Sequence, residues 1–361
     1  MIVSVNTAEN IRHENERLLA RALQGILARV HWLRGWRVEA SRDPAWDLTV
    51  SGTAPGGGRV KLFVECKKHF PPSAFLGLSE RPAAGVARVL AMPYVSPRMA
   101  ALCEEHGWGW FDLAGNCRLE IPGVLLIERS GIDPVRIEEP PSANLSTVES
   151  GFVVRALLAP ENAGVRWTQR GVVEHFESGA APSLALVNKV VQYLREQAFV
   201  EELPNRGFRV RDPEGLLRKW SAVYRFSRRS RRRYFSLLSN RALHEKLRGL
   251  ATRGLAAYGA FSAAEVQAPH VRQARIWLYL DAPVEKAFAE TAEAKIVDSG
   301  ENLVVLIPHD PGIFYGLDES EGRLACTNAV QTYVDLLHAG GRGEEAAEAV
   351  LQQRLRVAWR Q

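Results

Sequence analysis

Residues 60–69 read VKLFVECKKH, and this stretch decides how the first part of the chain folds. Its first half is apolar enough for a buried strand, but it continues into an acid and two lysines. Because successive side chains point to opposite faces of a strand, Glu65 and Lys67 share one face. Residues 47–52 (DLTVSG) form a second strand-like run, and the glycine-rich turn that follows predicts a hairpin. We expect this hairpin to bring Asp47 beside Glu65.

Two carboxylates and an amine at one point of a sheet suit a specific chemistry. Carboxylate oxygens bind hard cations such as Mg²⁺ or Mn²⁺, and a nearby lysine can orient a water molecule and offset phosphate charge. Asp47, Glu65 and Lys67 are therefore candidate catalytic residues. The candidate metal ligands are Asp47 and Glu65, with Glu14 or Glu16 of the preceding helical segment as a further acid. The alternative is that Glu65 and Lys67 form only an ion pair at a strand end.

The rest of residues 1–132 predicts an α/β domain. A long amphipathic helix is expected within residues 10–33, where apolar residues recur at helical spacing. Short strands and helices alternate after the hairpin, up to two strand-like runs within residues 117–128. One helix, three strands and then alternating helices and strands predict a sheet covered by helices.

A helix carrying acids, followed by Asp47 and by Glu65-Cys66-Lys67, resembles the PD-(D/E)xK superfamily of restriction-endonuclease-like folds. The resemblance covers about the first 130 residues. It implies a DNA nuclease that depends on Mg²⁺ or Mn²⁺. The proline of the family motif does not stand directly before Asp47, where this chain has Trp46. The chain can also have kept this fold and lost the chemistry.

A different pattern follows residues 133–146, which are rich in Pro, Ser and acids and are expected to form a linker. Residues 147–234 predict three short helices and then a hairpin that turns at residues 204–207 (PNRG). This order describes a winged helix-turn-helix, which binds duplex DNA through its third helix. Docking of another protein is the alternative use of such a domain.

The third helix offers specific candidates for DNA contacts. Its core-facing residues are expected to be Leu184, Val187, Val191 and Leu194. The residues expected nearer its outward face, and therefore near DNA, are Ser183, Lys189, Gln192 and Tyr193. Arg206 and Arg209 belong to the wing, where they can reach a minor groove or the DNA backbone. DNA binding of this kind requires no cofactor.

Basic charge is concentrated directly after this domain. The chain has a net charge of +5, but residues 214–253 contain twelve Lys or Arg against two Glu. The centre of this stretch interleaves arginines with aromatic residues and contributes Arg228, Arg229, Arg231, Arg232 and Arg233. Such a mixture suits phosphate contacts and base stacking, so we count these arginines among the candidate DNA-binding residues. A solvated helix face or a protein-docking segment remains the alternative.

Residues 235–361 predict a third domain, of α/β type, with strand-like runs such as ARIWLYLDA and NLVVLIP followed by terminal helices. Together with the preceding domain it resembles the AbiEi family of type IV antitoxins. The residues that carry the likeness are Asn328, Gln331, Tyr333, Asp335, Leu336 and Gly340-Gly341-Arg342-Gly343. The resemblance implies a winged-helix repressor of its own promoter, which binds inverted repeats, and a nucleotidyltransferase-like toxin as partner. This chain carries an additional α/β domain in front.

The sequence thus predicts a multidomain chain of α/β and α+β folds: a restriction-endonuclease-like domain, a central winged helix and a C-terminal α/β domain. The four cysteines are far apart, so neither a zinc site nor a disulfide framework is expected. No stretch reads as a signal peptide or membrane span, so we expect a cytoplasmic protein without a membrane partner. A DNA-binding regulator, by analogy a homodimer, is favoured over a DNA nuclease, and protein docking by all three domains is a third possibility.

Overall fold

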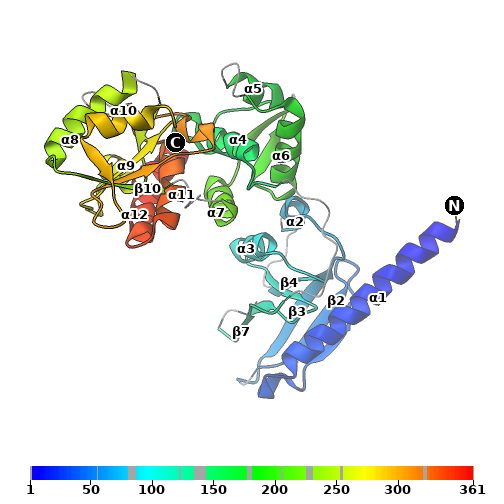
Figure 1. Ribbon diagram of the computed structural model, residues 1–361. Coiled ribbons are helices and arrows are strands. Elements are labelled where there is room, and N and C mark those ends of the chain that lie inside the picture. Colours follow the sequence, from blue (N-terminus) through cyan, green and yellow to red (C-terminus); the bar gives the residue numbers. More distant parts are fainter. Residues whose placement is uncertain are drawn as a thin grey trace. The chain divides into compact units, whose positions relative to one another are not determined.

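The computed structural model shows a chain of two compact units, Met1–Ser142 and Ala143–Gln361 (Figure 1). The division falls within residues 133–146, where the sequence predicts a linker. The structure describes residues 2–54, 56–79, 87–121, 123–133, 144–176, 181–204, 206–224, 231–252, 255–319 and 323–360. Among these residues, no helix combines the length and the apolar character that a bilayer span requires.

The first unit contains a seven-stranded sheet whose strands follow one another in chain order. Its strands are β1 (Arg37–Ala40), β2 (Leu48–Thr53), β3 (Arg59–Cys66), β4 (Ala87–Met92), β5 (Gly109–Asp112), β6 (Cys117–Ile121) and β7 (Leu125–Arg129). Strands β1 to β3 pair antiparallel, β3 to β5 parallel, and β5 to β7 antiparallel. The two parallel connections are made by α2 (Pro72–Ser79) and α3 (Pro97–Glu105), as parallel pairing requires a crossover.

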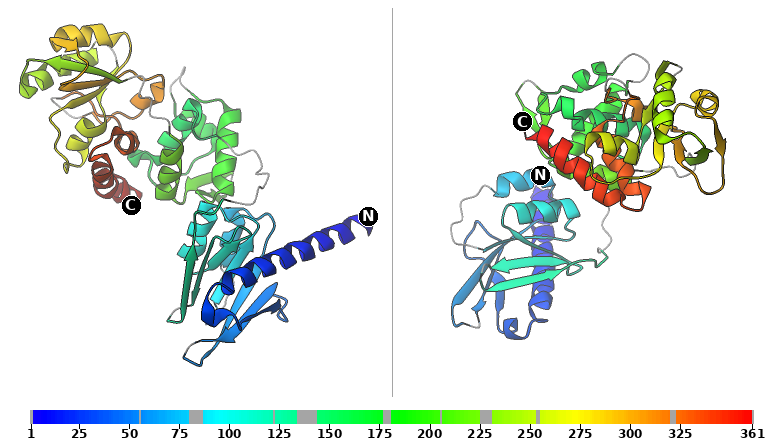
Figure 2. Two further views of the ribbon diagram at one scale, coloured as in Figure 1. Left: turned by 60° about the horizontal axis from the view of Figure 1, so that its bottom comes forward. Right: turned by 90° about the vertical axis from the view of Figure 1, so that its left-hand side faces the viewer.

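Helices cover both faces of this sheet. The long α1 (Ile2–Leu27) runs across one face (Figure 2), where Leu19 and Leu23 pack with Val64 and Phe111. Buried residues that alternate with these along the strands, such as Leu90, belong to the opposite face. On this opposite face, the aromatic rings of α2 pack against those of the segment before β5. The sequence order of helix, strands and crossover helices is confirmed.

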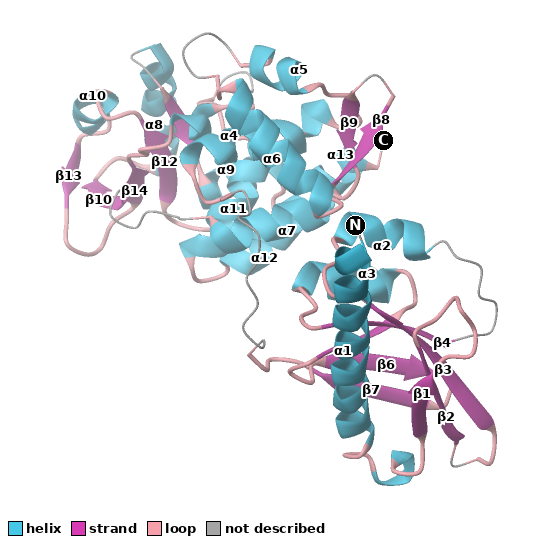
Figure 3. Ribbon diagram, turned by 90° about the vertical axis from the view of Figure 1, so that its right-hand side faces the viewer, coloured by secondary structure: helices cyan, strands magenta, loops and turns pink. Residues whose placement is uncertain are grey.

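The second unit begins with three helices and a hairpin. These elements are α4 (Val148–Leu158), α5 (Gln169–Glu174), α6 (Leu184–Glu196), β8 (Val200–Leu203) and β9 (Gly207–Val210), followed by α7 (Pro213–Val223). A short 3-10 turn, Pro160–Asn162, connects α4 to the segment before α5. Helix α6 contacts α4, α5 and β8, so the hairpin lies beside it (Figure 3). The predicted order of three helices and a hairpin is confirmed.

A five-stranded sheet follows in the order β11-β12-β14-β10-β13. Its strands are β10 (Arg231–Ser236), β11 (Ala256–Tyr258), β12 (Ile276–Leu280), β13 (Ala294–Ile296) and β14 (Leu303–Leu306). Among the described strands of this sheet, only β12 and β14 pair parallel. The helices are α8 (Asn240–Leu247), α9 (Ala260–Gln267), α10 (Val284–Thr291), α11 (Ala329–Ala339), α12 (Gly343–Val350) and α13 (Arg356–Trp359), with a π-helical turn at Leu351–Leu355 and 3-10 turns at Arg248–Thr252 and Pro311–Phe314.

The helix–hairpin elements and the C-terminal helices share one hydrophobic core. Phe152 of α4 and Leu194 of α6 belong to the same cluster as Trp277 of β12 and Val334 of α11. A second cluster, around Phe288, fills the other face of the five-stranded sheet. The sequence suggested a domain boundary between residues 234 and 235, but these residues lie inside β10. Strand formation thus joins the arginine-rich segment to the C-terminal sheet.

Candidate nucleic-acid interface and acid–lysine cluster

Helix α6 is strongly amphipathic. Ser183 caps it, because its side-chain oxygen accepts a hydrogen bond from the Leu186 amide. The buried face consists of Val187, Val190, Val191, Tyr193 and Leu194. The exposed residues are Leu184, Ala185, Asn188, Lys189, Gln192 and Glu196. From Asn188 onward, the exposed side chains of the helix are therefore amides or charged groups.

Two expected orientations on α6 are wrong. Tyr193 is only 9% exposed and packs in the core instead of facing outward. Leu184 is 44% exposed and does not face the core, because it stands in the first turn of the helix. Asn188 was missed as an exposed polar residue. Its spacing of four residues from Gln192 is the signal that places both on one face.

The hairpin beside α6 is fixed by backbone pairing. Trp167, just before α5, exchanges two backbone hydrogen bonds of 2.8 Å with Phe208 of β9. Arg206 stands in the turn with a positive φ of 59° and an exposed side chain. Arg209 is exposed and forms an ion pair with Glu201 across the hairpin. The turn thus presents Arg206 to solvent, while Arg209 has a partner within the hairpin.

The described part of the arginine-rich segment has protein partners in the fold. Arg228 and Arg229 lie outside the described residues, and Arg231, Arg232 and Arg233 belong to β10. The guanidinium of Arg231 lies 4.7 Å from the centre of the Trp277 ring. Nη1 of Arg232 donates to both carboxylate oxygens of Glu285, at 2.6 and 2.5 Å. Nη1 of Arg233 donates to the Asp298 carbonyl at 2.8 Å.

The acid–lysine cluster assembles at the end of the β2–β3 hairpin. Leu48 pairs with Val64, so Asp47 stands at the position opposite Glu65, as expected. Oδ2 of Asp47 accepts a 2.7 Å hydrogen bond from the Cys66 amide. Nζ of Lys67 donates to Oε1 of Glu65 at 2.5 Å, and Glu65 is 5% exposed. The structure therefore brings Asp47, Glu65 and Lys67 to one strand end.

The structure distinguishes between the two acids, Glu14 and Glu16, that the sequence offers on the first helix. Burial raises the pKa of the Cys66 thiol, and the charges of Asp47, Glu16 and Glu65 raise it further, while Lys67 lowers it. This electrostatic effect places Glu16 near the cluster, whereas Glu14 is exposed. Asn15, between the two acids, is buried. The helix phase therefore favours Glu16 as the acid that accompanies the cluster.

The acid–lysine cluster supplies only part of the ligand set that a metal ion needs. Carboxylate oxygens of Asp47 and Glu65 are of the right chemical type for Mg²⁺. However, Oδ2 of Asp47 accepts a backbone amide, and Oε1 of Glu65 binds Lys67. Within the described ranges, no group of three or more His, Cys, Asp or Glu side chains is placed to hold a metal ion.

The polar residues near the C-terminus that carry the AbiEi resemblance form a buried network. Asn328 caps α11 by accepting a hydrogen bond from the Gln331 amide. The side chain of Gln331 accepts a 2.7 Å hydrogen bond from Nε of Arg155 and donates to Asp335 at 2.7 Å. Burial raises the pKa of Asp335 to about 7, against the opposing effect of hydrogen bonds from Gln331 and Tyr279. This network joins α4 to α11 inside the shared core.

Residues 209–356 match the model of a family described as transcriptional regulator, AbiEi antitoxin, type IV toxin–antitoxin system. This part of the chain is similar to AbiEi antitoxins. The match begins in β9 and ends at the last helix, so it includes the five-stranded sheet and the buried network. Comparison with curated proteins and with solved structures gave no match.

Proposed function

We propose that this protein is a DNA-binding transcriptional regulator of antitoxin type, with a winged helix-turn-helix formed by α4 to α6 and the β8–β9 hairpin. The observation that carries the proposal is the exposed polar face of α6 beside that hairpin, on a chain whose C-terminal part is similar to AbiEi regulators. In winged helices, an amphipathic third helix enters the major groove and the hairpin contacts the flanking DNA.

The exposed side chains of α6 have the chemistry that base reading needs. Asn188 and Gln192 each carry an amide that can both donate and accept, which is the pattern that recognises adenine in the major groove. Lys189 can bind guanine or a phosphate. Because their spacing puts all three on one helix face, they can contact neighbouring base pairs at the same time.

Arg206 is the wing residue in this proposal. Its exposed side chain at the hairpin turn can enter a minor groove or bind a phosphate. The arginines of β10 have a smaller role, because Arg232 and Arg233 already bind protein oxygens.

The AbiEi resemblance suggests the biological setting. A repressor of this type would bind an inverted repeat in its own promoter as a homodimer, because symmetric half-sites match a two-fold symmetric protein. A nucleotidyltransferase-like toxin would be encoded beside it. The additional N-terminal unit distinguishes this chain from the two-domain pattern of that family.

Binding to duplex DNA tests the proposal. Fluorescence anisotropy with short duplexes from the region upstream of the gene should show saturable binding that weakens as salt rises. A scrambled duplex of equal length is the control for sequence preference. Equal, weak binding to both duplexes would contradict a regulator with a defined site.

The acid–lysine cluster favours a second candidate function, a metal-dependent DNA nuclease. The observation behind it is the approach of Glu16, Asp47, Glu65 and Lys67 to one strand end. In that function Asp47 and Glu65 would hold Mg²⁺, which polarises a phosphate, and Lys67 would orient the attacking water. Incubation of supercoiled plasmid with Mg²⁺, Mn²⁺ or EDTA, beside Lys67→Ala, tests it. Cleavage that needs metal and is lost in the variant supports a nuclease, and DNA that is bound but never cut excludes one.

A further inference from the structure

A surface pocket of about 480 Å³ lies in the second unit, between α8, β11 and α9. Helices α8 and α9, both labelled in Figure 1, supply most of its lining, and we call it the α8–α9 pocket. Sites for small molecules commonly measure roughly 300–1,000 Å³. The α8–α9 pocket is therefore large enough for a small metabolite.

Two arginines with free guanidinium groups line this pocket. Arg248, directly after α8, and Arg323 are both exposed. In the part of the chain that the structure describes, neither guanidinium has a hydrogen-bond or ion-pair partner. Burial raises the pKa of the Tyr258 hydroxyl and the charge of Cys326 raises it further, whereas the charges of Arg248 and Arg323 lower it. Because both cations act on one hydroxyl, they lie near the same point of the pocket wall.

A histidine beside that hydroxyl offers a further donor. Nδ1 of His244 lies 2.5 Å from the hydroxyl oxygen of Tyr258, and His244 lines the pocket. Burial lowers the pKa of His244, although the charge of Glu265 opposes this effect, so the ring favours its neutral form. When the Tyr258 hydroxyl donates to Nδ1, the ring proton is on Nε2, where it can be donated to an anion.

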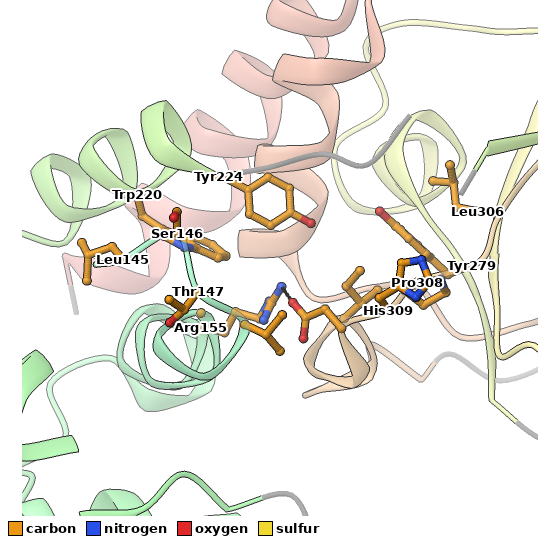
Figure 4. A pocket seen from close by; sticks show the side chains of 14 residues that line it. Leu145, Ser146, Thr147, Arg155, Trp220, Tyr224, Tyr279, Leu306, Pro308 and His309 are labelled. Carbon is orange, nitrogen blue, oxygen red and sulfur yellow. Dashed lines mark hydrogen bonds and ion pairs between the residues drawn. The ribbon is translucent and has the colours of Figure 1, made fainter. Parts of the chain in front are cut away.

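The cavity around Arg155 shows the opposite arrangement of a cation (Figure 4). Arg155 is fully buried, and its Nε and Nη2 donate to Gln331 at 2.7 Å and to Asp310 at 2.6 Å. That cation is neutralised inside the protein and holds α4 to α11. The guanidinium groups of Arg248 and Arg323, in contrast, are open to solvent and available to an external anion.

The acids of the α8–α9 pocket restrict the kind of anion. Glu245 is held by Arg241, whose Nε lies 3.3 Å from its Oε1. Glu265 of α9 is exposed and also lines the pocket. A carboxylate accepts hydrogen bonds and repels negative charge. The ligand therefore needs one anionic group for the two free arginines and a hydroxyl group that donates to Glu265.

We propose that the α8–α9 pocket binds a small phosphomonoester that carries hydroxyl groups, with its phosphate held by Arg248 and Arg323 and a hydroxyl donating to Glu265. A terminal phosphate has three acceptor oxygens, which suits two guanidinium groups and the imidazole of His244 together. Sugar phosphates and nucleoside monophosphates share this chemistry. The proposal does not rest on the proposed DNA-binding function, because binding is measured without DNA.

Isothermal titration calorimetry of the full chain with ribose 5-phosphate and AMP tests the pocket, with ribose and inorganic phosphate as comparisons. At least one of the two esters should bind saturably, about tenfold or more tightly than either comparison. The two esters separate the possible sources of the ligand. Absence of saturable binding for both esters would overturn the proposal. Inorganic phosphate that binds as tightly as the esters would indicate an adventitious ion only, and would overturn it as well.

Substitution of the two arginines locates the binding. Arg248→Gln and Arg323→Gln each remove a cation without breaking a described contact, so each variant should keep its melting temperature and bind the better ester about tenfold more weakly. Arg272→Gln is the matched control, because Arg272 is exposed and lies outside the pocket lining. Equal affinity in all three variants would place the ester elsewhere and would contradict the proposal.

Glu265→Gln tests the hydroxyl contact separately from the phosphate contact. The variant removes a negative charge from the lining, so inorganic phosphate should bind more tightly than it does to the natural chain. The preference for the ester over inorganic phosphate should shrink at the same time. An unchanged preference would exclude the contact with Glu265. Loss of DNA affinity in the Arg248 and Arg323 variants, without ester binding to the natural chain, would assign these arginines to DNA phosphates and overturn the proposal.

Discussion

The hydroxyl of Tyr279 donates a 3.0 Å hydrogen bond to Oδ1 of Asp335, and both side chains are buried. Burial raises the pKa of Asp335 to about 7, although the unfolded chain keeps an ordinary value near 3.9. Between these pH values the native state holds a proton that the unfolded state has lost. The free energy of unfolding should therefore fall by roughly 1.4 kcal/mol per pH unit from this group as pH rises toward 7, and level off above it.

Asp335→Asn removes this titration and keeps an acceptor for Tyr279 and Gln331. Urea unfolding at pH 5, 6, 7 and 8 should show the variant gaining stability relative to the natural chain up to about pH 7. A difference that stays constant across this range would mean that Asp335 titrates normally.

The amides on α6 should control sequence preference. Asn188→Ala and Gln192→Ala each remove an amide from the exposed face, so each should weaken binding to the preferred duplex by about 1–3 kcal/mol and leave binding to the scrambled duplex nearly unchanged. Glu290→Ala, on the exposed side of α10 and away from α6, is the control for the loss of a surface side chain from a helix. Equal losses on both duplexes would show that these amides do not read bases.

Arg206 allows stability and binding to be separated. Its positive φ of 59° is strained for arginine and better tolerated by asparagine, so Arg206→Asn should keep or slightly raise the melting temperature. The same change removes a cation from the wing, so DNA affinity should fall. The slope of log affinity against log salt concentration should also become shallower, by about the amount that one phosphate contact contributes. Arg211→Asn offers a comparison outside the turn. Unchanged affinity for the Arg206 variant would exclude a wing contact.

Arg232 should matter for stability more than for DNA. Its Nη1 binds both oxygens of Glu285, which also accepts a 2.7 Å hydrogen bond from the Tyr234 hydroxyl. Because Arg232 is about half exposed, Arg232→Ala should cost no more than about 1 kcal/mol of stability and should leave DNA affinity within about twofold. A loss of DNA affinity comparable to that of the α6 variants would show that β10 is part of the DNA interface.

The sequence predicts the elements better than their partners. The β2–β3 hairpin follows from its alternation and its glycine turn, so the placement of Asp47 opposite Glu65 was predictable. The interaction partners of the β10 arginines were not predictable, because Glu285 lies 53 residues beyond Arg232 and no local pattern connects the two. When the strand partners are unknown, the cluster of arginines and aromatic residues is typical of an exposed nucleic-acid-binding surface.

Helix faces were predicted only where the apolar pattern was unambiguous. Tyr193 is amphipathic, and it packs in the same core cluster as Val190 and Leu194 although a tyrosine can also face solvent. In α1 the choice between Glu14 and Glu16 depends on helix phase, and the buried Asn15 interrupts the apolar signal that would set it. The shared core of the second unit joins residues far apart in the chain and leaves no sequence pattern to detect.

DNA affinity of the Lys189→Glu variant tests the central claim most directly. Lys189 is exposed on α6 and lies outside the buried core, so the variant should fold normally. Anisotropy titrations at several salt concentrations should show weaker binding than the natural chain, with the largest loss at low salt, where like-charge repulsion between glutamate and phosphate is least screened. Lys286→Glu, on the exposed side of α10, is the matched control and should bind as the natural chain does. Equal affinity of the two variants at every salt concentration would contradict the claim that α6 enters the DNA groove.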